Sequence, residues 1–144
     1  MAKSKKPILY IGNGCRSDEA LRLLKIIIDK LQIPFFVSWS AIDLFPNDNL
    51  LNMGRIGLYG DRAANITLQK ADLLLCLGTR LAIPQVGYSL TDFARNATKW
   101  IVDIDETECN KFDNLKYQVL NTSVLDFLID FNKLLGINSI KVSK

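Results

Sequence analysis

The sequence predicts an α/β fold, a three-layer, doubly wound parallel sheet of the Rossmann-like kind with five to six strands. The first reason is that short apolar segments alternate with segments of helical periodicity along the whole chain. The second is that two of the apolar segments close on a glycine, Gly12 and Gly78, as strands that feed tight loops often do. The 144 residues have the length of one domain, residues 1–144, and we expect residues 1–6 and 138–144 to be flexible ends.

The first predicted strand covers residues 7–12 and precedes a helix. Ser17 is a suitable N-cap for that helix, and Asp18 and Glu19 lie in its first turn, where the helix dipole favours acidic side chains. Pro34 ends the segment. The apolar side chains of the helix fall on one face, at Ala20, Leu24, Ile27, Ile28 and Leu31.

A second strand is predicted at residues 35–38, followed by residues 40–55, which are mostly loop with one helical turn. A helix at residues 61–70 then leads to a third strand at residues 73–77. Because this third strand is apolar on both faces, we expect it to lie in the middle of the sheet.

The alternation continues to the end of the chain. A loop with a short helix is predicted at residues 87–97, followed by a strand at residues 100–103 and a short helix at residues 106–111. A strand at residues 117–120 and a long helix at residues 122–135 complete the chain. Asp105 is placed to cap the short helix, and Gly136 is placed as the C-cap of the last one.

Composition excludes several classes of function. Histidine is absent, which excludes Ser-His-Asp, Cys-His and histidine-ligated metal mechanisms from this chain. The three cysteines, Cys15, Cys76 and Cys109, form neither a disulfide framework nor a zinc motif, and favour a cytoplasmic location. The net charge is +3 with no basic stripe, and no apolar run reaches the length of a membrane span, so we expect neither nucleic acid nor membrane as partner.

Candidate binding residues follow three predicted strands, where ligands bind in sheets of this kind. Gly12-Asn13-Gly14 after the first strand is either a phosphate-binding loop at a helix N-terminus or a plain tight turn. Gly78-Thr79-Arg80 after the third strand supplies an arginine suited to a phosphate or, alternatively, to a salt bridge. Asp103 after the fourth strand suits ribose hydroxyls or a hydrogen bond within its loop, whereas Asp105 is better explained as a cap.

Other polar and reactive side chains are weaker candidates. Tyr59, in the loop Gly57-Leu58-Tyr59-Gly60, either lies across the crevice or packs under its own loop, and packing is favoured. Cys15 and Cys76 are predicted to be structural. Glu106 and Glu108 are predicted to form a solvated helix start.

Four ordered segments resemble a known family from about residue 6 to residue 135. The chain is similar to the central domain of thiamine-diphosphate-dependent enzymes of the acetolactate synthase type. The matching segments are residues 8–14, 57–65, 71–80 and 102–105. Residues 78–81, 85–88 and 93–97 are similar to synthase-like members found among bacterial surface-polysaccharide genes.

This resemblance implies a six-stranded domain that lies between a pyrimidine-binding and a diphosphate-binding domain, and that binds FAD in acetolactate synthases or an ADP-like nucleotide in some relatives. The cofactor-binding residues carried over by the resemblance are Gly12, Asn13, Gly14, Leu58, Tyr59, Gly60, Gly78, Thr79, Arg80, Asp103 and Ile104. Thiamine diphosphate and Mg²⁺ would be held by the other two domains of a full-length parent, because the catalytic glutamate and the Gly-Asp-Gly…Asn-Asn signature do not occur here.

Two departures from the family pattern weaken the case for FAD while leaving a nucleotide site. FAD-binding synthases continue after the arginine into Asp-Asp-Arg, where this chain has residues 81–85 with no charge. They also carry Gly-Asp where this chain has Leu120-Asn121. Leucine in place of glycine removes room for a ligand.

Three hypotheses for function remain. The first is an isolated central domain, acting as scaffold and as an FAD or adenine-nucleotide site without the catalytic domains. The second is an NAD-dependent deacylase, which shares the topology but needs a histidine base that this chain lacks. The third is a stand-alone nucleotide-binding or interaction module. The oligomeric state and the parent's substrate are not set by this sequence.

Overall fold

The computed structural model describes residues 4–113 and 115–136 and contains a parallel sheet. Its strand order is β2 (Phe35–Val37), β1 (Pro7–Ile11), β3 (Leu73–Leu77), β4 (Thr98–Asp103) and β5 (Tyr117–Asn121). The predicted fold class is therefore confirmed, and β3 occupies the centre of the sheet, as its wholly apolar sequence predicts.

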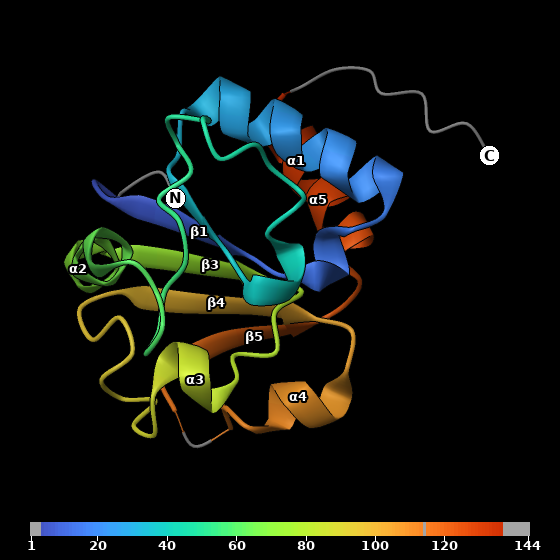
Figure 1. Ribbon diagram of the computed structural model, residues 1–144. Helices are drawn as coiled ribbons and strands as arrows, with labels where there is room; N and C mark the ends of the chain where they lie inside the picture. Colours follow the sequence, from blue (N-terminus) through green and yellow to red (C-terminus); the bar gives the residue numbers. More distant parts are fainter. Residues whose placement is uncertain (1–3, 114, 137–144) are drawn as a thin grey trace.

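Helices cover both faces of the sheet and complete the three layers (Figure 1). One face carries α1 (Asp18–Leu31) and α5 (Val124–Leu134), and the other carries α2 (Arg62–Lys70) and α3 (Ile83–Val86). The short α4 (Glu106–Asn110) follows β4. Two single 3-10 turns, η1 (Asn13–Cys15) and η2 (Trp39–Ala41), follow β1 and β2. No helix within the described residues is long and apolar enough to cross a bilayer.

Alternation along β1 divides the core into two clusters. Leu9 and Ile11 pack with α1 and α5, whereas Ile8 and Tyr10 pack with α2 and α3, because successive side chains of a strand point to opposite faces. Cys76 lies fully buried in the middle of β3, which confirms its predicted structural role.

Three predicted elements differ from the structure. The short helix expected within residues 87–97 lies earlier, at α3, because Pro84 suits the first turn of a helix and Gly87, at φ +81°, ends it. Strand β4 begins at Thr98 rather than at residue 100 because Lys99 pairs within the sheet. Helix α5 begins at Val124, because the Oγ of Ser123 accepts the Asp126 N–H and so caps it.

The sheet of the described residues has five strands, and where the resemblance implies a sixth there is a single parallel bridge between Asn52 and Phe35. The Phe35 N–H donates to the Leu51 carbonyl at 2.9 Å, and the Met53 N–H donates to the Phe35 carbonyl at 2.8 Å. The loop after β2 therefore lies along the outer edge of β2 and shields it.

Part of the predicted flexible ends, residues 1–3 and 138–144, lies outside the described residues. Residues 4–6 are attached to the body of the domain through Asp72. Its carboxylate accepts the N–H groups of Lys5 at 2.7 Å and of Lys6 at 3.0 Å. The pKa of Asp72 lies below its ordinary value. The largest cause is the contact of the Ser4 hydroxyl with its carboxylate, and the two backbone hydrogen bonds add to it.

Candidate functional site

A cavity of about 700 Å³ opens at the carboxyl ends of the strands, around the switch point between β1 and β3 where the strand order reverses. Its volume is in the range of small-molecule sites. The cavity is lined by Asn13, Gly14, Ser17, Ser38, Ser40, Gly78, Thr79, Arg80, Ala82, Gln85, Asp103, Ile104, Asp105, Glu108, Ser123, Val124 and Leu125. It thus brings together most of the predicted binding residues, whereas Gly12, Leu58, Tyr59 and Gly60 do not line it.

The glycines of the first loop lie directly against Gly78. The Gly12 N–H donates to the Leu77 carbonyl at 2.8 Å, and the Gly14 N–H donates to the Gly78 carbonyl at 3.0 Å. A Cβ on Gly12 would lie 2.1 Å from the Gly78 carbonyl oxygen, and one on Gly14 would lie 2.8 Å from the Gly78 Cα. Gly78 itself has φ +53°. Close approach of two backbones therefore accounts for all three glycines.

Four N–H groups of this loop, those of Gly12, Gly14, Cys15 and Arg16, donate to carbonyls within the protein. The Cys15 N–H donates to the Gly12 carbonyl and the Arg16 N–H to the Asn13 carbonyl, each at 3.1 Å. A phosphate at Gly14, Cys15 or Arg16 would have to displace these bonds. The Cys15 side chain is buried, and its Sγ donates to the Leu77 carbonyl at 3.4 Å. Burial raises the pKa of this thiol to about 12, as expected for a structural cysteine.

Arg16 holds the side of the cavity formed by the loops after β1 and β2. Its guanidinium donates to both carboxylate oxygens of Asp43, to the Ser40 carbonyl and to the Asn13 Oδ1, each at 2.7 Å. The hydrogen bonds from Arg16 lower the pKa of Asp43 to about 2. The sequence did not reveal this pair, because the two residues are 27 positions apart.

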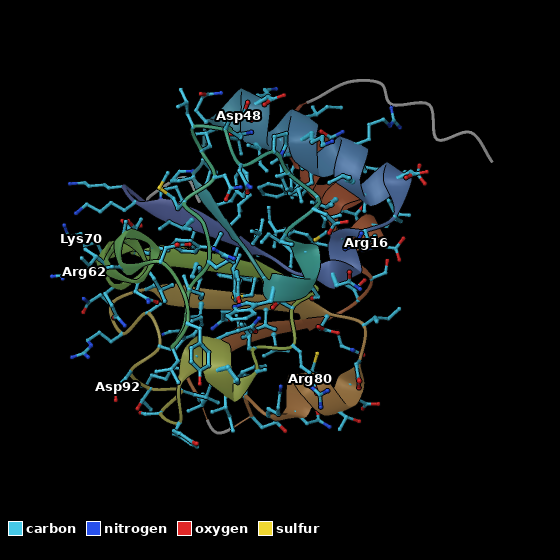
Figure 2. All side chains as sticks on the ribbon, viewed as in Figure 1. Arg16, Asp48, Arg62, Lys70, Arg80 and Asp92 are labelled. Atoms are coloured by element: carbon cyan, nitrogen blue, oxygen red, sulfur yellow. The ribbon has the colours of Figure 1, made fainter. Side chains whose placement is uncertain are left out.

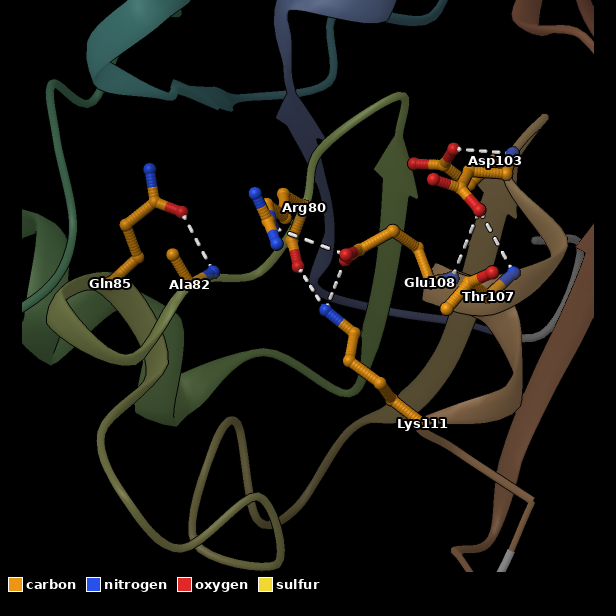
Figure 3. Close-up of polar contacts among 8 residues, drawn as sticks. Arg80, Ala82, Gln85, Asp103, Thr107, Glu108 and Lys111 are labelled. Carbon is orange, nitrogen blue, oxygen red and sulfur yellow. Dashed lines mark hydrogen bonds and ion pairs between the residues drawn. The ribbon is translucent and has the colours of Figure 1, made fainter.

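Arg80 lies on the opposite side of the cavity and is also paired (Figures 2 and 3). Its Nε lies 3.1 Å from the Glu108 Oε1, and Lys111 contacts the other oxygen of Glu108 while donating to the Arg80 carbonyl at 2.7 Å. The Glu108 side chain is 17% exposed and that of Arg80 is 79% exposed. The prediction that Glu108 belongs to a solvated helix start is wrong, because this carboxylate lies between two cations.

The turn after β4 is stabilised by its own side chains. The Asp105 Oδ1 accepts the Thr107 N–H at 2.9 Å and the Glu108 N–H at 3.4 Å, which confirms the predicted cap. The Asp103 Oδ1 accepts the Asp105 N–H at 3.0 Å. The Asn121 amide, from the end of β5, donates to the Asp103 and Ile104 carbonyls, each at 3.1 Å. Asn121 therefore holds the turn that presents Asp103 and Ile104 to the cavity.

The loop at residues 57–60 is closed on itself and on α3. The Asn65 side chain bonds both the N–H and the carbonyl of Gly57 at 2.9 Å, and the Leu58 N–H donates to the Pro84 carbonyl at 2.8 Å. Leu58 and Tyr59 are 77% and 71% exposed. The Tyr59 ring meets the Trp39 ring edge-on, with centroids 6.1 Å apart, so the interpretation that Tyr59 packs under its own loop is wrong.

Comparison with known proteins assigns the chain to a family. The family model described as "Thiamine pyrophosphate enzyme, central domain" matches residues 1–125. The chain belongs to this family.

This central domain is similar to acetolactate synthases. It is 36% identical over 111 residues to the acetolactate synthase of Mycobacterium bovis, a match that covers 77% of this chain and 18% of the relative. It is 34% identical over 108 residues to the acetolactate synthase isozyme 1 large subunit of Escherichia coli, covering 75% and 19%. The large subunit of Porphyra purpurea is 34% identical over 109 residues, covering 76% and 18%. The chain thus spans less than a fifth of the length of these relatives.

The residues present do not fit the FAD that the resemblance implies. Leu58, one of the carried-over cofactor residues, donates its N–H to the Pro84 carbonyl instead. The Gly14, Cys15 and Arg16 N–H groups, which follow the first strand, are already bonded within the protein. Ala82 and Pro84 supply no charge in place of the Asp-Asp-Arg stretch. The cavity that remains is bounded on this side by Ala82 and Gln85.

Proposed function

We propose that the chain acts as the central scaffold domain of an acetolactate-synthase-like, thiamine-diphosphate-dependent enzyme. The observation that carries this proposal is the family match over residues 1–125, together with relatives that extend far beyond the matched segment. Thiamine diphosphate and Mg²⁺ would then be held outside this chain.

The partners of the scaffold would be the pyrimidine-binding and diphosphate-binding domains of the parent. Exposed large apolar side chains gather in the segments that follow β2, β3 and β4, and Ile104 among them lines the cavity at the carboxyl edge of the sheet. They include Trp39, Ile42, Leu58, Tyr59, Ile83, Tyr88 and Ile104. Apolar surface concentrated in one region marks an interface, and we infer that this edge faces the other domains.

The cavity itself would hold the adenosine part of a nucleotide. Asp103 would accept hydrogen bonds from ribose hydroxyls through the carboxylate that also receives the Asp105 N–H, and Ile104, which is exposed, would offer an apolar surface to a base. Asp103 and Ile104 are the two residues that the resemblance assigns to the ribose and the adenine, and both line the cavity.

Assembly tests the scaffold role. The sequence that adjoins this chain in the source genome, in the same reading frame or in neighbouring ones, should encode the two other domains, and polypeptides carrying those domains should form a complex with this chain in analytical ultracentrifugation. Replacing Leu58 and Tyr59 by aspartate should weaken the complex at least about tenfold, because two desolvated apolar side chains would become charged. Leu134→Asp is the matched control, since Leu134 is 84% exposed and ends α5, which runs away from the cavity edge. Flanking frames that encode unrelated domains, or equal effects of the two changes, would contradict the proposal.

A further inference from the structure

We propose that this cavity binds an uncharged, hydroxylated ligand of nucleoside size and rejects diphosphates, and that Glu108 is the residue that sets this preference. The inference rests on the proposed nucleoside site and narrows it to one class of ligand. The charged and hydrogen-bonding side chains that line the cavity support it.

Neutral donors and acceptors make up most of the polar lining. Hydroxyl and amide groups that follow four of the strands, β1, β2, β3 and β5, point to a ligand that offers hydroxyls and amide-like edges in return. These groups belong to Asn13, Ser17, Ser38, Ser40, Thr79, Gln85 and Ser123. Such a lining suits a ribose and a base.

The charged part of the lining is acidic. Three carboxylates, those of Asp103, Asp105 and Glu108, face one guanidinium, that of Arg80. Arg80 is paired with Glu108. The guanidinium of Arg16 donates hydrogen bonds to Asp43, Ser40 and Asn13. Because like charges repel, a diphosphate entering here is opposed by three carboxylates, whereas the one guanidinium of the lining already has Glu108 against its Nε.

Glu108 is the carboxylate whose charge can be changed with least effect on the fold. Asp105 caps α4 and Asp103 holds its own turn, so both have structural roles. The Glu108 side chain instead lies between Arg80 and Lys111. Removing its charge would leave the Arg80 guanidinium, which lines the cavity, and the Lys111 ammonium, which donates to the Arg80 carbonyl, without their shared anion, and both would then attract phosphate.

The experiment is isothermal titration of the 144-residue chain with adenosine, ADP and FAD at low ionic strength. Adenosine should bind at least about tenfold more tightly than ADP, and FAD should give no heat of binding. In Glu108→Gln the affinity for ADP should rise about tenfold while that for adenosine stays within about twofold. Circular dichroism checks that each variant is folded.

Glu106→Gln is the matched control. It removes the same charge from the same helix, but Glu106 is exposed and does not line the cavity, so the affinity for ADP should change less than about twofold. Tighter binding of ADP than adenosine by the unmodified chain, or equal gains in the two variants, would overturn the inference. If none of the three compounds binds to any variant, the nucleoside site itself is wrong, while the scaffold role stands on the assembly experiment.

Discussion

The wall of the cavity that joins the first loop to Gly78 is built backbone against backbone, whereas the wall formed by Arg80 and the turn after β4 is built from charged side chains. In the first wall, Gly12 and Gly14 leave no space for a Cβ, and the N–H of each donates to a carbonyl at the end of β3. In the second, the Arg80 guanidinium is largely exposed and rests on Glu108. The first wall therefore contributes to the stability of the domain, and the second sets the charges that line the cavity.

The largest expected effect is on the backbone wall. Gly12→Ala should destabilise the domain by about 3 kcal/mol, because the new methyl would lie 2.1 Å from the Gly78 carbonyl oxygen and neither backbone can move without breaking its hydrogen bonds. Urea unfolding followed by circular dichroism measures the change.

Gly136→Ala separates steric conflict from the general cost of replacing a glycine. Gly136 has φ +63°, and no atom of the described residues lies within 4 Å of an added Cβ, so only the strain of a left-handed alanine, about 1 kcal/mol, is expected. A Gly12→Ala variant no less stable than Gly136→Ala would show that the first loop and Gly78 are not packed as described, and that the glycines serve a ligand instead.

A smaller effect is expected in the charged wall, at Asn121. Asn121→Asp removes the donor to the Asp103 and Ile104 carbonyls and places a carboxylate against them, so the domain should lose about 1 kcal/mol of stability. Chemical denaturation measures this loss. Asn110→Asp adds the same charge at an exposed position on α4 and should change stability by less than about 0.5 kcal/mol. Equal losses would indicate that charge, rather than the hydrogen bonds of Asn121, is responsible.

Most of the fold was predictable because its signals are local. The apolar run of β3, the Ser17 and Asp105 caps and the spacing of apolar residues in α1 each follow from neighbouring residues, and the structure bears them out. The position of α3 was missed because residues 83–86 form a single turn, too short for periodicity to be visible, and only Pro84 marked it. The edge bridge at Asn52 has no sequence pattern of its own.

The site was predictable in location but not in chemistry. Topology alone places the ends of β1, β3 and β4 at one edge, so Asn13, Arg80 and Asp103 were expected near one another. Whether a glycine serves a ligand or a neighbouring backbone depends on contacts between loops some 64 residues apart, such as Gly14 with Gly78. The pairing of Arg16 with Asp43 and of Arg80 with Glu108 is likewise long-range. Periodicity and motifs carry no information about such pairs.

The smallest expected effect is on the pH dependence of stability and concerns the Arg16–Asp43 pair. The pKa of Asp43 is lowered from 3.8 to about 2 by the hydrogen bonds from Arg16, so the unfolded chain takes up a proton at this carboxylate before the folded chain does. The stabilisation is therefore fully present above about pH 4 and is lost as the pH falls towards 2. Since both side chains are exposed, water and salt screen the pair, and only a small difference in melting temperature is expected.

Thermal unfolding of the unmodified chain and of Asp43→Asn at pH 7, 4 and 2.5 measures this difference, which should shrink on acidification and in high salt. Asp48→Asn, an equal change of charge in the same connecting segment, should show no such trend. A gap that grows as the pH falls would mean that Asp43 is not held by Arg16 in solution. Arg16 would then be free to bind an anion at the cavity. The backbone wall would in that case also offer a cation to a ligand, on a side of the cavity where the described residues show Arg16 paired with Asp43.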